Sequence, residues 1–316
     1  MSDIQVKVLR RHPAAEGICS YELARADGGP LPAFSAGSHI DVHLPAGLVR
    51  QYSLCNDDRE THRYRIAVLR DPASRGGSIA LHDQVREGDT LTISAPRNHF
   101  ALVAAPHSLL LAGGIGITPL LCMAQRLAHA GQSFSLHYCT RSLARTAFRD
   151  EVTALGDRAH LHLDDGAASQ KLDLSAVLAG VPAGTHLYVC GPGGFIDFVM
   201  NTAKAAGWPA ERLHLEYFGA GPQDTSGDRA FEVRLASTGK TYTVPADKTV
   251  VAALQAHGVD VLVSCEQGVC GTCLTRVLKG ECDHRDMYLT DAEKAANDQF
   301  LPCCSRAKSD LLVLDL

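Results

Sequence analysis

The sequence lacks the features that would direct a chain to a membrane, to export or to nucleic acid. Its 316 residues carry a formal net charge of only -5, which leaves no large basic excess for nucleic acid or an anionic membrane. The opening MSDIQVKVLRRH is polar and has no apolar segment of the kind found in export signals. Residues 98–125 contain no Asp, Glu, Lys or Arg, but GGIGITP interrupts them, so a membrane-spanning run of about 20 apolar residues is missing. We expect a cytoplasmic protein without nucleic-acid or membrane partners.

Internal repeats and low-complexity tracts are missing as well. Hydrophobic residues make up 46% of the chain and charged residues 21%, which are ordinary values for a soluble globular protein with buried cores. The length exceeds that of one typical domain and predicts two or three.

Short strands separated by turn residues are expected over the first hundred residues. Stretches such as HIDVHLPAG, VRQYSLCN, RYRIAVLRD and DTLTISAP alternate apolar and polar residues or form β-branched runs, and Gly, Pro, Asn and Asp bound them. Strands at this regular spacing predict an antiparallel β-barrel domain over residues 1–101.

The pattern changes at residue 102. Short apolar strands such as HSLLLAGG and THLYVCGP alternate with helical stretches such as PLLCMAQRLAHAGQ, RTAFRDEVTAL and GGFIDFVMNTAKAAG. This alternation predicts an α/β domain with a mainly parallel sheet over residues 102–222. FGAGPQDTSGD, residues 218–228, has the composition of a linker. Residues 223–316 are expected as a third domain, which begins with the strand pair FEVRLASTGKTYTVP and closes with the strand LLVLDL.

Six of the eleven cysteines lie between residues 265 and 304. In a chain without an export signal we expect a reducing compartment, where disulfides are rare. The spacing is Cys265-x4-Cys270-x2-Cys273, and Cys303 follows after 29 residues. This is the plant-type ferredoxin spacing for a 2Fe–2S cluster held by four thiolates.

Glycines fit the same interpretation. Gly268 and Gly271 permit backbone conformations closed to other residues, which would turn amide N–H groups towards the sulfurs and stabilise the charge of a cluster. A structural zinc site would instead favour paired Cys-x2-Cys units with a gap of roughly 15 to 20 residues. Spacing alone leaves the fourth ligand open among Cys303, Cys304 and Cys282, although adjacent residues of an extended chain point in opposite directions.

Two further patterns suit a flavin. RQYSL places Arg50 and Tyr52 on one side of an expected strand, as a cation for a phosphate and an aromatic ring for an isoalloxazine; a surface charge and a packing residue are the alternative. In RDPASRGGSIALHD, Gly76, Gly77 and Ser78 open an expected helix, whose free N–H groups can bind a phosphate.

Two strand-to-helix turns suit a dinucleotide. GGIGITP lies after an expected strand and before a helix, although it departs from the usual G-x-G-x-x-G pattern. CGPGGF forms a second such turn. Its Cys190 is either a core residue at the end of a strand or a small, soft group that lines the path of a hydride.

The order of these motifs resembles the phthalate dioxygenase reductase family. Its members are FMN-containing reductase components of Rieske-type oxygenases and include the vanillate O-demethylase reductases. The resemblance rests on RQYSL and GGS, then GGIGITP and CGP, then CEQGVCGTC and LPCCSRAKSDLLVLDL, and it covers nearly the whole chain. It implies a C-terminal β-grasp ferredoxin domain after the barrel and the α/β domain.

The resemblance also implies roles for individual residues. Ser53 would lie near the reactive edge of the flavin, Thr118 would reach the flavin from the nicotinamide domain, and with Cys190 they form the expected catalytic set. Of the adjacent cysteines Cys303 and Cys304, the family uses the first as the ligand. The FMN site is expected to comprise Arg50, Gln51, Tyr52, Ser53, Leu69, Arg70, Asp71, Gly76, Gly77, Ser78, Thr118 and Phe218. The nicotinamide site is expected to comprise Gly113, Gly114, Gly116, Thr140, Arg141, Cys190, Gly191 and Pro192.

The implied activity is electron transfer from NADH, with NADPH left open by Arg141, through FMN and the 2Fe–2S cluster to a partner Rieske-type oxygenase. The residues from 223 onward hold 14 Asp or Glu against 10 Lys or Arg, which would suit a basic patch on that partner. Two alternatives stay open. One is a self-contained diaphorase or quinone reductase that uses a small acceptor, and the other is an electron carrier whose flavin segment no longer functions.

Overall fold

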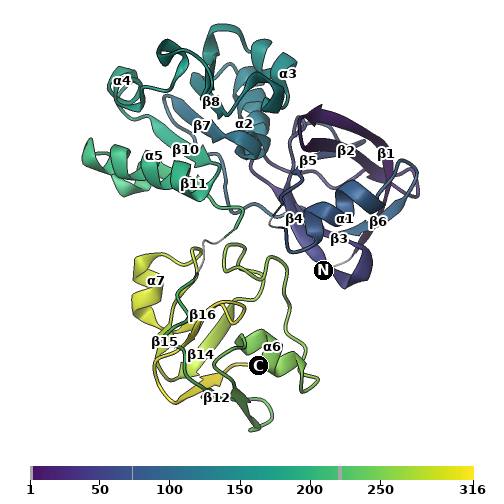
Figure 1. Ribbon diagram of the computed structural model, residues 1–316, viewed down its shortest axis with the longest axis vertical. Coiled ribbons are helices and arrows are strands. Elements are labelled where there is room, and N and C mark those ends of the chain that lie inside the picture. The colour runs from purple at the N-terminus through teal and green to yellow at the C-terminus, as the bar shows by residue number, and fades with distance from the viewer. Residues whose placement is uncertain (1–2, 73, 220–222) are drawn as a thin grey trace. The chain divides into compact units, whose positions relative to one another are not determined.

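The computed structural model describes residues 3–72, 74–219 and 223–316. They form two compact units, residues 1–216 and 217–316. Both the strand-rich segment and the α/β segment lie in the first unit (Figure 1). The finer division with boundaries at 101/102 and 222/223 stays a prediction.

The first part of unit 1 is a six-stranded antiparallel sheet that curls so that its end strands β4 and β5 contact each other. Its inward-facing side chains form one core that includes Val6, Tyr21, Ile40 and Tyr64. The strand order is β4-β3-β6-β1-β2-β5, with β1 (Ile4–Ala15), β2 (Ile18–Arg25), β3 (His39–His43), β4 (Val49–Ser53), β5 (Tyr64–Leu69) and β6 (Thr90–Ile93). Helix α1 (Gly77–Gln84) connects β5 to β6. The predicted antiparallel barrel is confirmed.

The second part of unit 1 is a five-stranded parallel sheet. Its order is β11-β10-β7-β8-β9, with β7 (Ser108–Gly113), β8 (Phe134–Thr140), β9 (Ala159–Leu163), β10 (His186–Cys190) and β11 (Leu213–Glu216). Helices α2 (Ile117–His129), α3 (Arg149–Thr153), α4 (Leu174–Gly180) and α5 (Gly193–Ala205) cover it (Figure 1). From β7 the chain adds β8 and β9 on one side and then crosses to β10 on the other. The direction of strand addition therefore reverses beside β7.

One face of this sheet packs against α2. Leu110 and Tyr138 of the sheet share a core with Leu120 and Leu121 of α2, which begins directly after the glycine-rich loop. Short 3-10 helices occur at Pro45–Gly47, Gly114–Gly116, Leu143–Arg145, Gly156–Arg158, Ala168–Gln170 and Ala210–Arg212. Among the described residues, no helix has the length and apolar character needed to cross a membrane.

A partly buried ion pair joins the two parts of unit 1. Arg65 of β5 binds Glu151 of α3 through two bonds of 2.7 and 2.6 Å, and the guanidinium also donates to the Cys55 carbonyl at 2.9 Å. Its plane lies over the Phe148 ring, 4.8 Å from the centroid. The Arg65 side chain is 11% exposed and that of Glu151 is 35% exposed.

We expect Glu151→Gln to lower the free energy of unfolding by about 2 kcal/mol, less than the 3–5 typical of a fully buried pair because a third of Glu151 remains in water. Chemical denaturation followed by flavin release measures this. The matched control is Asp27→Asn, which breaks the largely exposed pair with Arg25. It should leave the transition unchanged. Equal losses in the two variants would contradict the assignment.

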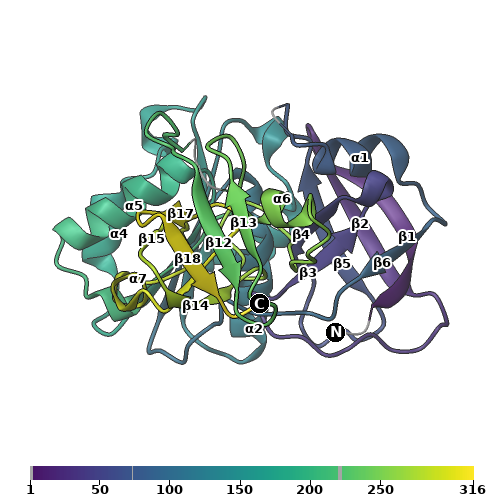
Figure 2. The same cartoon turned by 90° about the horizontal axis from the view of Figure 1, so that it is seen from below.

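The second unit is a mixed five-stranded sheet with one helix against it, as expected for a β-grasp fold. Figure 2 shows β12, β13, β18 and β14 from below. The order is β13-β12-β18-β14-β16, with β12 (Phe231–Leu235), β13 (Thr241–Val244), α6 (Val250–Gln255), β14 (Thr275–Lys279), β16 (Gln299–Phe300) and β18 (Leu311–Leu314). A small pair, β15 (Cys282–Asp283) and β17 (Arg306–Ala307), and helix α7 (Asp291–Ala296) complete it. The last strand of the chain, β18, is thus the middle strand of the sheet.

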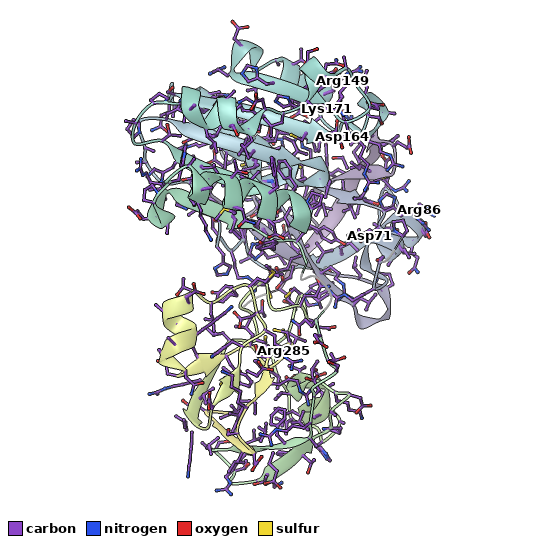
Figure 3. All side chains as sticks on the ribbon, turned by 60° about the vertical axis from the view of Figure 1, so that its left-hand side comes forward. Asp71, Arg86, Arg149, Asp164, Lys171 and Arg285 are labelled. Carbon is purple, nitrogen blue, oxygen red and sulfur yellow. The ribbon has the colours of Figure 1, made fainter. Side chains whose placement is uncertain are left out.

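Ion pairs hold the start of this unit in place. Arg285, labelled in Figure 3, binds Asp228 at 2.5 Å and Asp283 at 2.7 Å, and its carbonyl accepts from the Gln223 side chain at 3.0 Å. Hydrogen bonds to Arg285 lower the pKa of Asp228. Of the predicted linker 218–228, residues 220–222 lie outside the described residues, and the stretch from Gln223 to Asp228 is bound to unit 2.

Candidate functional site

The four predicted ligand cysteines lie together in unit 2. As thiols, Cys265 hydrogen-bonds to Cys270 and to Cys303, and Cys273 hydrogen-bonds to Cys303. All four are buried, with 4–7% of each residue exposed. Because it accepts these bonds, Cys265 has a pKa well below that of an ordinary thiol. Among the described residues no three His, Cys, Asp or Glu side chains meet as they would around a single metal ion. Four thiols joined by these three bonds fit the four-thiolate ligand set of a 2Fe–2S cluster.

The backbone of the loop is shaped around these sulfurs. The Gln267 amide donates to the Cys265 sulfur at 3.3 Å, and the Thr272 amide donates to the Cys270 sulfur at 3.4 Å. Gly268 and Gly271 have φ values of +72° and +69°, which favour glycine. A Cβ added at Gly271 would lie 2.3 Å from the Tyr288 ring, so the space is taken as well. The loop therefore presents amide donors to anionic sulfur, as a 2Fe–2S cluster requires.

The remaining two cysteines nearby are placed differently. Cys282 lies in the core of unit 2, where burial raises the pKa of its thiol to about 12. Cys304 is partly exposed, and its sulfur lies 3.7 Å from the Leu301 carbonyl oxygen. Since Cys303 bonds to two of the other three sulfurs, the geometry favours Cys303 over Cys304 as the fourth ligand.

The candidate phosphate site is in the barrel part of unit 1. The guanidinium of Arg50 donates to the carbonyls of Val49 at 2.7 Å and Arg75 at 3.1 Å. It thereby lies across the first turn of α1, where a Cβ added at Gly77 would be 2.4 Å from Arg50 Cγ. This cation and the free N–H groups of the turn suit the phosphate of FMN.

Other members of the predicted flavin set surround this turn. Ser78 accepts a hydrogen bond from the amide of Asp71 at 3.2 Å, and Asp71 is labelled on the barrel part in Figure 3. Leu69 ends β5 with 40% of its surface exposed. Arg70 is paired with Asp83 at 2.9 Å. The Tyr52 side chain packs against the barrel core, and burial raises its pKa.

Gln51 points elsewhere. Its side-chain nitrogen lies 3.3 Å from the His39 ring nitrogen of the neighbouring strand β3. Successive residues of a strand face opposite ways, so Gln51 shares a face with Ser53 rather than with Arg50 and Tyr52. Its inclusion in the flavin site stays a prediction.

The two glycine-rich turns meet at the reversal point of the parallel sheet. Strands β7 and β10 are neighbours with Ala112 opposite Cys190, so GGIG and CGP leave the same edge of the sheet side by side. In open α/β sheets this is where a dinucleotide binds. The turns touch through their backbones: a Cβ added at Gly191 would lie 2.9 Å from the Gly113 Cα, and one at Gly113 would lie 3.0 Å from the Pro192 ring.

We expect Gly116→Ala to slow flavin reduction by NADH about 100-fold, because a displacement of about 1 Å at a reacting site costs that much. The added Cβ would lie 2.2 Å from the Cys190 carbonyl oxygen and force the two turns apart. Stopped-flow spectroscopy of the flavin measures the rate. The matched control, Gly180→Ala at the end of α4, adds a methyl group where nothing lies within 4 Å. A normal rate in Gly116→Ala with FMN bound would contradict the proposed site.

A buried carboxyl group lies next to the predicted catalytic residues. The Ser53 hydroxyl donates to Glu216 Oε2 at 3.4 Å, and Glu216 at the end of β11 lies opposite Cys190 of β10. The residue is half-buried, and burial raises the pKa of its carboxyl group to about 8. Cys190 is fully buried, and burial raises its thiol pKa. The structure thus brings Ser53 and Cys190 together around Glu216, which the sequence analysis did not select.

The remaining predicted residues have mixed settings. Thr118 is buried in the first turn of α2, and its hydroxyl donates to the Ile115 carbonyl at 3.1 Å. Thr140 is buried, with its hydroxyl 2.8 Å from that of Thr146, whereas the adjacent Arg141 is exposed at the end of β8. Phe218 is 42% exposed and belongs to unit 2. Contacts of these residues with a flavin or a nucleotide stay predictions.

Comparisons with known proteins agree with this geometry. Residues 233–308 match the family of 2Fe-2S iron-sulfur cluster binding domains, and residues 96–213 match the family described as the dimethylamine monooxygenase subunit DmmA-like, N-terminal domain. The solved structure of phthalate dioxygenase reductase, described as a modular structure for electron transfer from pyridine nucleotides to [2Fe-2S], is 42% identical with a TM-score of 0.78. The match covers 100% of this chain and 98% of that one. This chain belongs to the phthalate dioxygenase reductase family.

Two further proteins are similar to this chain over nearly its whole length. Vanillate O-demethylase oxidoreductase of Pseudomonas sp. (strain HR199 / DSM 7063) is 57% identical, over 99% of this chain and 100% of that protein. An intact type IV self-sufficient cytochrome P450 monooxygenase is 39% identical with a TM-score of 0.86. The match covers 99% of this chain but 41% of that longer one.

Proposed function

We propose that this reductase takes electrons from NADH and passes them, through FMN and a 2Fe–2S cluster, to a Rieske-type oxygenase that removes the methyl group of vanillate. The observation that carries the proposal is the set of four cysteine sulfurs joined by hydrogen bonds, in the same chain as two adjoining glycine-rich turns at the edge of a parallel sheet. The choice of an O-demethylase rests on the 57% identity with the vanillate O-demethylase oxidoreductase. FMN and the cluster together supply the conversion of a two-electron donor into single electrons.

In this proposal the protein binds and orients NADH and FMN, and it supplies no acid or base for hydride transfer. The pyrophosphate of NADH lies on the GGIG turn, whose glycines let the ligand approach the backbone. Arg50 and the first turn of α1 hold the FMN phosphate. Ser53 and Cys190, packed around the carboxyl group of Glu216, line the place where hydride moves. They exclude water there, and the proximity and orientation of the nicotinamide and the flavin then promote hydride transfer.

In unit 2 the loop fixes the electron-transfer centre. The thiolates of Cys265, Cys270, Cys273 and Cys303 hold the irons, and the amides of Gln267 and Thr272 stabilise the sulfur charge. None of the eleven cysteines forms a disulfide in the structure. This supports placing the protein in the reducing cytoplasm.

The deciding experiment reconstitutes the reductase with the oxygenase component of a vanillate O-demethylase. NADH oxidation and demethylation of vanillate should both require the two proteins together, and NADPH should be tested beside NADH. Demethylation with the second protein absent, or a high rate of NADH oxidation with a quinone and no coupling to the oxygenase, would favour a self-contained diaphorase instead.

A further inference from the structure

One buried histidine lies beside the Ser53 hydroxyl that donates to Glu216. His39 begins β3 with 5% of its surface exposed, and it lies directly opposite Ser53 of β4 in the antiparallel register. Opposite residues of two such strands project from the same face, with Cβ atoms about 4.5–5.5 Å apart. The His39 ring is therefore the neighbour of the hydroxyl that binds the Glu216 carboxyl group.

A second histidine leads from His39 to the solvent. The rings of His39 and His99 have centroids 5.6 Å apart and planes inclined by 33°. Over this separation a proton can pass directly or through one water molecule. His99 is exposed. Ser53, His39 and His99 thus form a series of proton-carrying side chains that ends in water.

Bonds to β3 fix the segment that carries His99. His39 and Arg97 exchange two backbone hydrogen bonds of 2.9 and 3.0 Å. The Arg97 guanidinium also binds Asp41 of β3 at 2.6 Å. Both contacts lie two residues before His99, so the separation of the two rings is set by the barrel.

Gln51 suits both charge states of His39. Its side-chain nitrogen lies 3.3 Å from Nε2 of the His39 ring. An amide donates through its nitrogen to a neutral imidazole and, after a half-turn, accepts through its oxygen from a protonated one. His39 can therefore gain and lose a proton while it keeps this partner.

The two ends of the series differ in protonation at neutral pH. Burial raises the pKa of Glu216 to about 8, so this carboxyl group holds a proton. Burial, and then the charge of Arg97, lower the pKa of His99, so its ring is neutral and can accept a proton. Asp41 and Arg97, the charged groups beside the two rings, form an ion pair with each other.

We propose that His39 and His99 carry to water the proton that NADH oxidation releases at the flavin site. The inference rests on the proposed function. Oxidation of NADH yields NAD⁺, two electrons and one proton, and the electrons leave singly through the cluster. Hydride transfer needs no acid or base, but the proton must leave when the electrons do. It passes from Ser53 and Glu216 to His39, then to His99 and then to water, and each histidine binds one proton and gives one up.

The experiment reduces the holoprotein with NADH and then mixes it with excess ferricyanide, which accepts electrons and no protons. A pH-indicator dye in weak buffer follows the protons, and flavin absorbance follows the electrons. In His99→Gln, flavin reduction by NADH should keep its normal rate. Proton release and flavin reoxidation should both slow about tenfold, since a positioned base contributes at least that much. His39→Gln should behave alike, with circular dichroism to show that it is folded.

Rescue by a mobile base separates proton transfer from a structural role. Imidazole in the buffer should restore fast proton release in His99→Gln, because position 99 is exposed and free imidazole can reach it. The matched control is His43→Gln. His43 is exposed on the same face of β3, roughly 13 Å along the strand from His39. This variant should release protons like the unsubstituted protein.

Three results would overturn the proposal. They are normal proton release in His99→Gln or in folded His39→Gln, slow release in His99→Gln that imidazole does not restore, and equal slowing in His43→Gln. If NADH does not bleach the flavin of the unsubstituted protein, the proposed function fails instead.

Exchange of the Glu216 proton gives a readout without turnover. Protonated Glu216 has an infrared carbonyl band, which Glu216→Gln identifies by its loss. After transfer to D₂O at about pH 6, below the pKa of this group, the band should shift about tenfold more slowly in His99→Gln than in His43→Gln. Equal rates in these two variants would show that the proton reaches water by another route.

Discussion

Cys270→Ser should abolish the visible absorbance of the iron–sulfur cluster while flavin reduction by NADH continues at its normal rate. Cys270 hydrogen-bonds to Cys265 within the set of four sulfurs, so its loss leaves three thiolates for two irons. The predicted flavin and nicotinamide residues other than Phe218 belong to unit 1, and none of them is in that set. Transfer of electrons to the oxygenase should fall to background, because the one-electron relay is gone. Iron and acid-labile sulfide analysis, with stopped-flow spectra of the flavin, measures both effects.

The matched control is Cys304→Ser. The Cys304 sulfur lies near the four ligand sulfurs, but it is directed at the Leu301 carbonyl oxygen, 3.7 Å away. The variant should therefore keep its cluster. Loss of the cluster in Cys304→Ser, with retention in Cys303→Ser, would reverse the assignment of the fourth ligand. Loss of flavin reduction in a folded Cys270→Ser protein would contradict the independence of the two centres.

Glu216→Gln should stabilise unit 1 at high pH. The pKa of Glu216 rises from 4.5 to about 8 in the folded protein because its carboxyl group is buried. Between these values the unfolded chain releases a proton that the folded protein keeps. Stability therefore falls as pH rises through this range, by about 1.4 kcal/mol per pH unit, and the loss is complete above pH 8. Glutamine stays neutral and removes this loss.

We therefore expect Glu216→Gln and the unsubstituted protein to unfold alike near pH 4.5 and the variant to be several kcal/mol more stable at pH 8.5, by this linkage. Denaturant titrations at three pH values, followed by flavin release, measure the difference. The matched control is Glu211→Gln, which changes an exposed glutamate in the short 3-10 helix directly before β11. This variant should unfold like the unsubstituted protein at each pH. An equal stability difference at both pH values would show that ionisation of Glu216 is not the cause.

The elements that sequence reasoning found are those with an unambiguous local pattern. Strands β3 to β6 are short alternating or apolar runs bounded by turn residues, and α2 and α5 carry apolar stripes long enough to be recognised. The cysteine spacing was sufficient to predict the four sulfurs, because Gly268 and Gly271 permit the positive φ values that the loop between them needs.

Where tertiary contacts decide, sequence reasoning failed. The helix expected over RTAFRDEVTAL is shortened to Arg149–Thr153, since Phe148 takes a left-handed conformation with φ of +56° under the Arg65 guanidinium. Strand β2 was not expected, because in ICSYELAR both Ser20 and Tyr21 are buried and strict alternation is lost. Helix α7 did carry a signal: Thr290 and Glu293 form a capping box at its start.

Glu216 was missed for a different reason. An acidic residue at the end of LHLE has no pattern of its own, and its significance depends on the pairing of β11 with β10 and on the hydroxyl of Ser53 from β4. These partners are 26 and 163 residues away in the chain. In the sequence, the one indication was an acidic residue at the end of a strand that is otherwise mostly apolar.

The position of β18 has a consequence for how the protein matures in the cell. Residues 311–314 form the middle strand between β12 and β14, so the earlier strands cannot join into one sheet before this segment leaves the ribosome. Until then Cys265, Cys270 and Cys273 lie on an incomplete scaffold, open to oxygen and to stray metal ions. Iron–sulfur assembly on this polypeptide must accordingly wait until residues 311–314 have emerged, and a frameshift or protease cut that removes β18 would yield a yellow protein without iron.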